Sequence, residues 1–263
     1  MKIDGQDANK FNKEKGFSMS DFLYNNPELY EMVFDRSAGD VCTDAFQKHL
    51  PQAPSSILDI GCGTGRELAK LSETFPDSDC VGFDVTPAMA AFAKKRNPNL
   101  TVLTGDMRSC RLNRTFDAIY AVGGSINFAL TNDELDQTIK TYQAHAHAGT
   151  LLLVEPLNPC HFFGGFQAPK TFSVPYKGKT ARGTASYELF KVQQIVERTR
   201  TWEFEEKKNN FVETMRFRVI FPSELAYFLT QNGFEILDIF EKPRNSIYVS
   251  SMYVVAKFNG KRA

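Results

Sequence analysis

Three aspartates and one glycine-rich turn stand at spacings that could hold a small charged molecule. Asp59, Asp84 and Asp106 each lie at the end of a short apolar run, and the turn GCGTG follows the first of them. Glycine lets a backbone approach a ligand closely, and carboxylates accept hydrogen bonds from amino and ribose hydroxyl groups. The series predicts a site for an adenosine-containing cofactor, whose amino, ribose and adenine portions would meet the three carboxylates in order.

The glycine spacing distinguishes among such cofactors. Glycines at 61, 63 and 65 give G-x-G-x-G, whereas a dinucleotide fingerprint is G-x-G-x-x-G and a triphosphate loop ends in Gly-Lys-Ser/Thr. A carboxylate at Asp59 would repel a diphosphate but would attract the cationic amino group of S-adenosylmethionine. The turn therefore favours S-adenosylmethionine, and a dehydrogenase is a distant alternative. Any one aspartate alone could simply cap the helix that follows it.

Alternating strands and helices are expected to position these residues. Apolar runs predict strands near 56–60, 79–84, 101–104, 116–121 and 150–155, and helical periodicity predicts helices near 65–74, 87–96 and 132–146. This alternation predicts an α/β fold with a doubly wound, mostly parallel sheet. Residues 171–221 instead alternate apolar and polar side chains, which predicts antiparallel strands. A helix near 223–231 and two final strands bring the expected large sheet to seven strands.

Composition narrows the class of protein. The 263 residues carry 31 basic and 31 acidic side chains. The chain therefore lacks the excess of positive charge that favours binding to nucleic acid or to an anionic membrane. No apolar run approaches the roughly 20 residues that a membrane helix needs, and the polar start is unlike a signal peptide. Five cysteines without a CxxC pair predict free thiols in a cytoplasmic setting and no metal site. The sequence does not decide whether two copies of the chain form a homodimer.

The segment from about 55 to 156 resembles the class I S-adenosylmethionine-dependent methyltransferases. The stretches GDMRSCRLNRTFDAIYAVGGSINFALTNDEL and AGTLLLVEP are similar to N-methyltransferases that dimethylate nucleotide-linked 3-amino sugars, and relatives of glycine N-methyltransferase come next. A weaker likeness in PELYEMVFDR and RFRVIFPSEL extends the resemblance to roughly 30–260. It implies a Rossmann-like methyltransferase fold, S-adenosylmethionine as cofactor and a small-molecule acceptor.

The resemblance also implies that the chain is divided into three regions. Residues 1–50 would form a loose tail and a helical lid, whose aromatic side chains close over the ligands. Residues 51–160 and 222–263 would form the cofactor-binding core. Residues 161–221 would form an antiparallel β insertion that covers the acceptor site.

The same resemblance assigns site residues by position. The expected cofactor contacts are Tyr24, Tyr30, Asp59, Gly61, Cys62, Gly63, Thr64, Arg66, Asp84, Val85, Met89, Gly105, Asp106, Met107 and Ala121. The expected acceptor contacts are Phe34, Ser125, Phe128, His161, Tyr176 and Arg216, and the expected catalytic residues are His161, Tyr30 and Phe128.

The acceptor side departs from the family pattern. Phe128 stands where the sugar N-methyltransferases tend to place His or Tyr, and Arg216 stands nearest to an inward-facing His of their antiparallel strands. Phenylalanine cannot accept a proton, which leaves His161, Tyr30, Tyr176 and Glu155 as candidates for that role; His145 and His147, at a helix end, are interpreted as structural. Arg216 could anchor a carboxylate or phosphate, or it could lie in solvent.

Methyl transfer asks mainly for positioning and exclusion of water, and a neutral amine needs no base in the transition state. The sequence therefore predicts a methyltransferase that acts on an amine nitrogen of a small molecule. Two alternatives remain: C- or O-methylation of a hydrophobic or acidic metabolite, and a catalytically silent protein that binds S-adenosylmethionine.

Overall fold

Short buried strands alternate with helices along the first part of the chain, and they assemble into one large sheet. The computed structural model describes residues 22–34, 37–163, 171–204, 211–243 and 250–260, so the predicted tail 1–20 lies outside the described residues. The strands of the large sheet are β1 (Ser56–Ile60), β2 (Asp79–Asp84), β3 (Thr101–Thr104), β4 (Phe116–Ala121), β5 (Ala146–Val154), β10 (Phe234–Pro243) and β11 (Ser250–Phe258).

The strand order confirms the predicted fold class. It is β10-β11-β5-β4-β1-β2-β3, in which β1 to β5 pair in parallel and β11 runs antiparallel to both β5 and β10. The order reverses between β1 and β4, and in such sheets ligands bind at the carboxyl ends of the strands beside the reversal. The glycine turn after β1 therefore lies where a ligand is expected.

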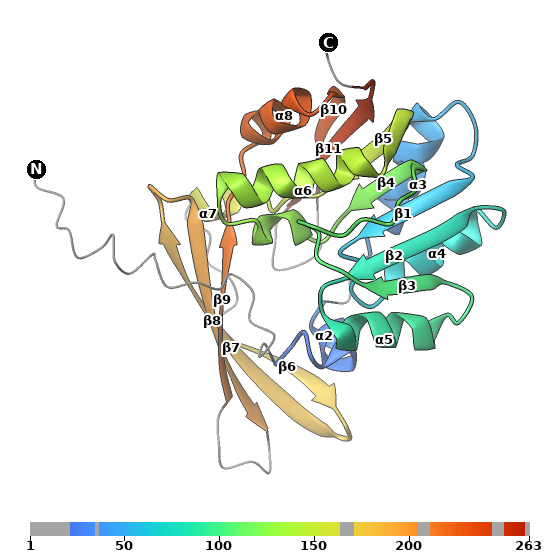
Figure 1. Ribbon diagram of the computed structural model, residues 1–263. Coiled ribbons are helices and arrows are strands. Elements are labelled where there is room, and N and C mark those ends of the chain that lie inside the picture. The colour runs from blue at the N-terminus through green and yellow to red at the C-terminus, as the bar shows by residue number, and fades with distance from the viewer. Residues whose placement is uncertain (1–21, 35–36, 164–170, 205–210, 244–249, 261–263) are drawn as a thin grey trace, which may run out of the picture.

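Helices cover both faces of the large sheet because its strands are apolar on both sides (Figure 1). Successive residues show the alternation: Ile57 packs with helices on one face and Leu58 packs with helices on the other. The first face carries α3 (Gly39–His49), α4 (Arg66–Thr74) and α5 (Pro87–Arg96), and the second carries α6 (Asn132–Ala144) and α8 (Pro222–Gln231).

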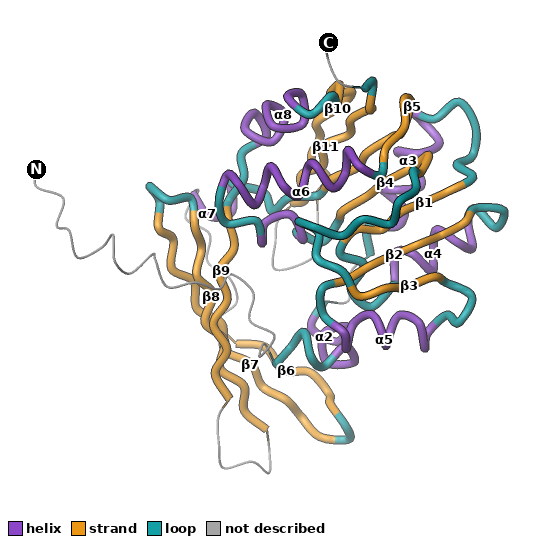
Figure 2. Tube along the Cα trace, viewed as in Figure 1, coloured by secondary structure: helices purple, strands orange, loops and turns teal. Residues whose placement is uncertain are grey.

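A second, small sheet is formed by the segment between α7 (Cys160–Phe163) and α8 (Figure 2). Its antiparallel strands are β6 (Thr171–Tyr176), β7 (Lys179–Phe190), β8 (Ile195–Phe204) and β9 (Phe211–Arg218), in that order. The sequence predicts antiparallel strands here, but it does not locate β6 and β7 individually. The small sheet extends away from the large one below the carboxyl ends of its strands.

A short N-terminal helix connects the two sheets. Helix α2 (Pro27–Val33) follows a turn at residues 22–25, and Leu23 and Leu29 are fully buried against Ala181 and Trp202 of the small sheet. On its other side α2 approaches α5, where Glu31 is ion-paired with Arg96. We call residues 22–34 the lid.

The described part of the chain lacks membrane-spanning helices and clusters of metal ligands. None of its helices has both the length and the apolar character needed to cross a membrane. Within the same ranges, His, Cys, Asp and Glu side chains form no group of three that could hold a metal ion.

Candidate functional site

The glycine turn joins β1 to α4 and is fixed by its backbone. The amides of Gly61 and Cys62 both donate to the carbonyl of Phe83, at 2.9 and 3.0 Å, which ties the turn to the end of β2. Gly61 has a φ of +80°, and a Cβ there would lie 2.8 Å from Cβ of Ser125. Glycine is therefore required at this position by both conformation and space.

Asp84, at the end of β2, holds the far side of this turn. Its Oδ2 accepts from the amide of Gly63 at 2.9 Å, and its Oδ1 accepts from the amide of Thr86 at 2.8 Å. Burial raises the pKa of Asp84, although the amides of Thr86 and Gly63 oppose that shift. Each carboxylate oxygen has a second acceptor position, so Asp84 can still bind hydroxyl groups of a ligand.

Asp84 lines the first and largest of three adjoining cavities, which has a volume of about 300 Å³. The lid supplies one side of it through Tyr24 and Tyr30. The glycine turn, the segments that follow β2, β3 and β4, and the helices α5 and α6 supply the rest, including Val85, Met89, Gly105, Asp106, Met107, Ser125, Phe128 and Glu134.

Asp106 in this cavity is oriented by an arginine. Nε of Arg108 donates to Oδ1 of Asp106 at 3.0 Å, and Nη2 donates to Oδ2 at 2.6 Å. Burial opposes ionisation of Asp106, but the hydrogen bonds and charge of Arg108 outweigh it and lower the pKa of the carboxyl. Nη1 of Arg108 also donates to Oε1 of Glu134 at 2.6 Å. Glu134 in turn closes a capping box with Thr131 at the start of α6.

Asp59 lines the second cavity, of about 60 Å³, together with Tyr30, Phe34, Cys62, Thr64, Arg66 and Glu155. The Asp59 side chain is 1% exposed, and its Oδ1 has no hydrogen-bond partner among the described residues. Burial raises the pKa of Asp59 well above its usual value. A cationic group in this cavity would satisfy that oxygen and would favour the charged carboxylate.

The third cavity, of about 30 Å³, opens toward the small sheet. It is lined by Tyr24, Tyr30, Phe34, Gly123, Gly124, Phe128, Leu157, Arg198, Met215 and Phe217. Tyr30 and Gly123 line all three cavities. The three spaces therefore meet at these two residues, which makes this junction the place where groups held in different cavities would come together.

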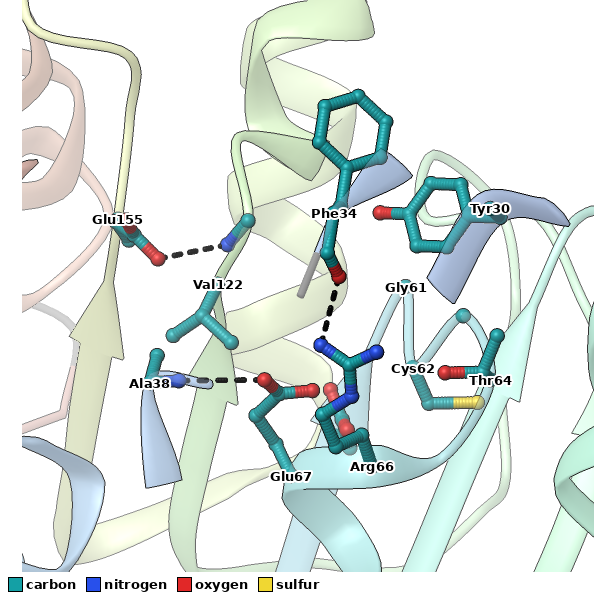
Figure 3. A pocket seen from close by; sticks show the side chains of 13 residues that line it. Tyr30, Phe34, Ala38, Gly61, Cys62, Thr64, Arg66, Glu67, Val122 and Glu155 are labelled. Atoms are coloured by element: carbon teal, nitrogen blue, oxygen red, sulfur yellow. Dashed lines mark hydrogen bonds between the residues drawn. The ribbon is translucent and has the colours of Figure 1, made fainter. Parts of the chain in front are cut away.

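Aromatic side chains of the lid cover the junction. Ring centroids lie 5.4 Å apart for Tyr24 and Tyr30, 4.9 Å for Tyr30 and Phe34, and 6.1 Å for Tyr24 and Phe128, the last pair edge to face. Arg66 holds the end of the lid, because its Nη1 donates to the carbonyl of Phe34 at 2.8 Å (Figure 3).

Most residues predicted for the cofactor line the two larger cavities. This holds for every member of the expected set except Ala121, which is buried in β4 one residue before Val122, a lining residue. Of the expected acceptor contacts, Phe34, Ser125 and Phe128 also line a cavity.

Three other expected acceptor residues, His161, Tyr176 and Arg216, lie outside these cavities, and their role in acceptor binding stays a prediction. His161 is buried in α7, where its Nε2 lies 2.7 Å from the carbonyl oxygen of Ser250 and so ties α7 to β11. The hydroxyl of Tyr176 donates to Oδ1 of Asn26 at 2.8 Å. Nε of Arg216 donates to Oε2 of Glu197 at 2.7 Å on the other face of the small sheet.

The remaining candidates for a proton-accepting role also have structural partners. Oε2 of Glu155 accepts from the amide of Gly123 at 2.8 Å. Nε2 of His145 accepts from the amide of Leu112 at 2.9 Å, and His147 lies on the surface, 3.0 Å from Asp117. His145 follows the last residue of α6, as predicted, whereas His147 lies in β5 and not at the helix end.

Sequence reasoning missed Arg198, the one cation among the residues that line the third cavity. A signal was present in IVERTRTWEF, because Arg198 and Arg200 are in phase with Val196 and Trp202. All four side chains are buried. In an alternating strand, residues in phase with a tryptophan face the same side.

Comparisons with known proteins agree with this geometry. Residues 57–149 match the model of a family described as methyltransferase domain. The chain is 34% identical over 119 residues to dTDP-3-amino-3,4,6-trideoxy-alpha-D-glucopyranose N,N-dimethyltransferase of Streptomyces venezuelae. The aligned residues are 45% of this chain and 48% of that protein. It is 32% identical over 160 residues to dTDP-3-amino-3,6-dideoxy-alpha-D-glucopyranose N,N-dimethyltransferase of Streptomyces fradiae. These aligned residues are 58% of this chain and 61% of that protein.

A solved structure extends the likeness in fold. The sugar N-methyltransferase KedS8 from Streptoalloteichus superposes with a TM-score of 0.73 over 94% of this chain and 95% of that one, at 21% identity. The regions matched in the two curated relatives span about half to three-fifths of their lengths. The family model, at residues 57–149, covers the glycine turn and the three aspartates.

Proposed function

We propose that this chain, which carries a methyltransferase domain of the S-adenosylmethionine-dependent type, methylates the amine nitrogen of a small molecule. Both curated relatives are named as N,N-dimethyltransferases of amino sugars, which favours a sugar amine among such acceptors. Five unpaired cysteines are compatible with the reducing cytoplasm as the place of action.

The residues present fit the cofactor. Asp84 would accept from ribose hydroxyls, and Asp106 would accept from the adenine amino group. Asp59, whose Oδ1 lacks a partner among the described residues, would accept from the amino group of the methionine end. When bound, S-adenosylmethionine supplies an electrophilic methyl group on a cationic sulfur.

One observation favours nitrogen as the atom that accepts the methyl group. The described lining of the third cavity contains phenols, one guanidinium and apolar side chains, but neither a carboxylate nor an imidazole. A hydroxyl or carbon acceptor usually needs a positioned proton acceptor, for which carboxylates and imidazoles are better suited than the phenols of Tyr24 and Tyr30, whose ordinary pKa is about 10. An amine attacks through its lone pair once it has lost its proton to solvent, so this lining suits an amine.

The chain's own contribution is then positioning and exclusion of water. Tyr24, Tyr30 and Phe128 cover the junction of the cavities with edge and tilted ring contacts. Holding two reactants in a near-attack arrangement can contribute up to about 7–11 kcal/mol.

The test is a mass-spectrometric assay with methyl-labelled S-adenosylmethionine and a panel of amino sugars paired with their hydroxyl counterparts. We expect label on the amines alone. The rate should rise with pH through the pKa of the acceptor amine, because only the neutral amine reacts. Asp84→Ala serves as the control with weakened cofactor binding, and its rate of transfer should be lower at subsaturating S-adenosylmethionine. Label on the hydroxyl members alone, or cofactor binding without transfer to any member, would contradict the proposal.

A further inference from the structure

The wall of the largest cavity contains a buried hydroxyl that the described residues leave without a hydrogen bond. Thr86 lies between β2 and α5 and lines this cavity together with Asp84. It is 1% exposed, and its Oγ1 has no hydrogen-bond partner among the described residues. Burying a hydroxyl without a partner costs free energy, so a polar atom left in this state beside a cavity indicates a ligand that satisfies it.

The helix that begins at Thr86 does not account for this hydroxyl. Thr86 is the N-cap residue of α5, where a threonine side chain usually accepts from an amide of the first turn. Its carbonyl starts the helix in the ordinary way by accepting from the amide of Ala90 at 3.1 Å. Its side chain, however, makes no capping hydrogen bond. The hydroxyl therefore remains available on the side of the cavity.

Asp84 is a polar neighbour of the hydroxyl. Oδ1 of Asp84 accepts from the amide of Thr86 at 2.8 Å, and Oδ2 accepts from the amide of Gly63 at 2.9 Å. Burial raises the pKa of Asp84, and the hydroxyl of Thr86 is among the groups that oppose this shift. The hydroxyl is thus close enough to act on the carboxylate, but it lies outside hydrogen-bond geometry.

A carboxylate beside a hydroxyl suits the hydrogen-bonding groups of a ribose. Each ribose hydroxyl has a proton to donate and an oxygen that accepts, whereas an ionised carboxylate can only accept. Asp84 would therefore satisfy the protons of the diol and leave its oxygens without a donor. A hydroxyl next to that carboxylate supplies the missing donor.

Two other donors in the lining already have acceptors. The guanidinium of Arg108 donates to Asp106 and Glu134 at 2.6 Å each. The hydroxyl of Ser125 donates to the carbonyl of Ile60 at 3.4 Å, beside β1. Neither arrangement places a donor next to the carboxylate at the end of β2, where a ribose is expected.

We propose that the hydroxyl of Thr86 donates to an oxygen of the ribose of S-adenosylmethionine, so that Thr86 and Asp84 bind the diol together. This proposal rests on the proposed function and adds a residue to its cofactor site. A deoxyribose at that oxygen would leave the hydroxyl buried and unpaired, and a site built to hydrogen-bond a hydroxyl discriminates against a ligand that lacks it. Thr86 is then a residue that determines specificity for the sugar of the cofactor.

The test removes the hydroxyl from the protein and from the ligand in turn. Thr86→Val replaces the hydroxyl by a methyl group of similar size, and Thr86→Ser keeps it. Thr104→Val is the matched control, because Thr104 ends the neighbouring strand β3, is exposed and lines none of the three cavities. Calorimetry measures affinity for S-adenosylhomocysteine and for its 2′-deoxy and 3′-deoxy analogues. Thermal unfolding measures the Tm of each ligand-free variant.

We expect Thr86→Val to weaken binding of S-adenosylhomocysteine by about 3- to 10-fold, the range for a neutral hydrogen bond. One deoxy analogue should bind Thr86→Val and wild type equally, which identifies the ribose oxygen that Thr86 contacts, and the other should lose affinity as the parent ligand does. Thr86→Ser should keep most of the affinity, and Thr104→Val should keep all of it. Because the removed hydroxyl has no partner, the Tm of ligand-free Thr86→Val should equal or exceed that of wild type.

The outcomes separate this proposal from the proposed function. If Thr86→Val weakens all three ligands equally, or weakens none, the ribose contact is overturned while methylation of an amine stands. A lower Tm of ligand-free Thr86→Val would also overturn it, since the hydroxyl would then stabilise the fold. If the affinities change as expected but no amine receives label, the ribose contact stands while amine methylation fails. Wild type that does not bind S-adenosylhomocysteine would overturn both.

Discussion

The cofactor side and the acceptor side of the site are held by different kinds of structure. On the cofactor side, backbone amides fix the carboxylate of Asp84, and the positive φ of Gly61 fixes the turn. On the acceptor side, side chains from the lid, from β8 and β9 and from Phe128 meet across long sequence separations. We call the first the rigid side, since backbone hydrogen bonds fix it, and the second the adaptable side, since single side chains form it.

The largest expected effect tests the rigid side. Asp84→Ala removes an acceptor of two backbone amides and of the expected ribose hydroxyls, and hydrogen bonds to charged groups contribute about 1.5–3 kcal/mol. Calorimetry should show affinity for S-adenosylhomocysteine falling by about 10- to 100-fold. Asp79→Ala, at the exposed opposite end of β2 and ion-paired with Arg114, should leave affinity unchanged. Equal affinities of the two variants for S-adenosylhomocysteine would contradict a role of Asp84 in binding the cofactor.

The next effect concerns the pH dependence of folding stability, whose sign follows from the pKa of Asp59. Burial raises the pKa of Asp59 above its usual value, so the folded protein holds this proton more tightly than the unfolded chain. Stability from this group is therefore present below a pH of about 4 and is lost as pH rises toward the raised pKa. Asp59→Asn should therefore raise the Tm of the free protein at pH 8, and should raise it less at pH 5. It should also reduce the thermal shift caused by S-adenosylhomocysteine.

Asp117→Asn is the control of opposite sign. Burial opposes ionisation of Asp117, but Ser55 and His147 outweigh it and lower the pKa of the carboxyl. Its contribution is present above the unfolded pKa, so this variant should be less stable than wild type at pH 8. Calorimetric scans at pH 5 and 8 check both signs, and a shift of Asp59→Asn in the same direction as Asp117→Asn would argue against a costly buried carboxylate.

A smaller effect is expected on the adaptable side. Phe128→Ala removes the edge-to-face contact with Tyr24, and aromatic pairs of this kind contribute about 0.5–1.5 kcal/mol. The KM for the acceptor should rise by about 2- to 10-fold, with affinity for S-adenosylhomocysteine unchanged. Phe163→Ala removes a ring contact with Phe221 on the exposed end of α7 and should change neither quantity. Loss of cofactor affinity in Phe128→Ala alone would assign this ring to the cofactor side.

The smallest effect concerns the lid. Arg96→Met breaks the ion pair with Glu31, and pairs this exposed contribute about 0.2–1 kcal/mol. Amide exchange in α2 should quicken by less than about fivefold, while α4 and α5 keep their rates. Lys95→Met, on the exposed side of the same helix, should leave exchange in α2 unchanged. Exchange throughout α5 that quickens equally would indicate a damaged helix rather than a loosened lid.

The same difference explains what the sequence could predict. Strands β2, β3 and β4 have the predicted bounds, since buried parallel strands read as short apolar runs between turns. The glycine turn and the carboxylates follow those strands directly, so their convergence could be anticipated from the strand order alone. Strand β7 was not located, because its residues KTARGTASYELF combine a glycine and small polar side chains with weak alternation.

The acceptor side could be predicted only in part. Phe34 and Phe128 were found through resemblance, but His161 was expected in the pocket because it follows β5, and its ring instead bonds β11. Arg216 was predicted either to anchor an acidic group or to lie in solvent, and in the register of β8 with β9 it lies opposite Glu197 and pairs with it. Alternation along β9 separates Arg216 from Met215 and Phe217, but it does not predict which partner a charged side chain on that face meets across the strands.

The shared carboxylate of Glu134 has a consequence for spectroscopy. One oxygen accepts from the amides of Leu130 and Thr131 at the start of α6, and the other accepts from Arg108, which also binds Asp106. A ligand group that draws Asp106 away from Arg108 would alter the charge seen by Glu134, and through it the first turn of α6. The amide resonances of residues 130–134 would thus serve as a native reporter of occupancy, readable without an added label.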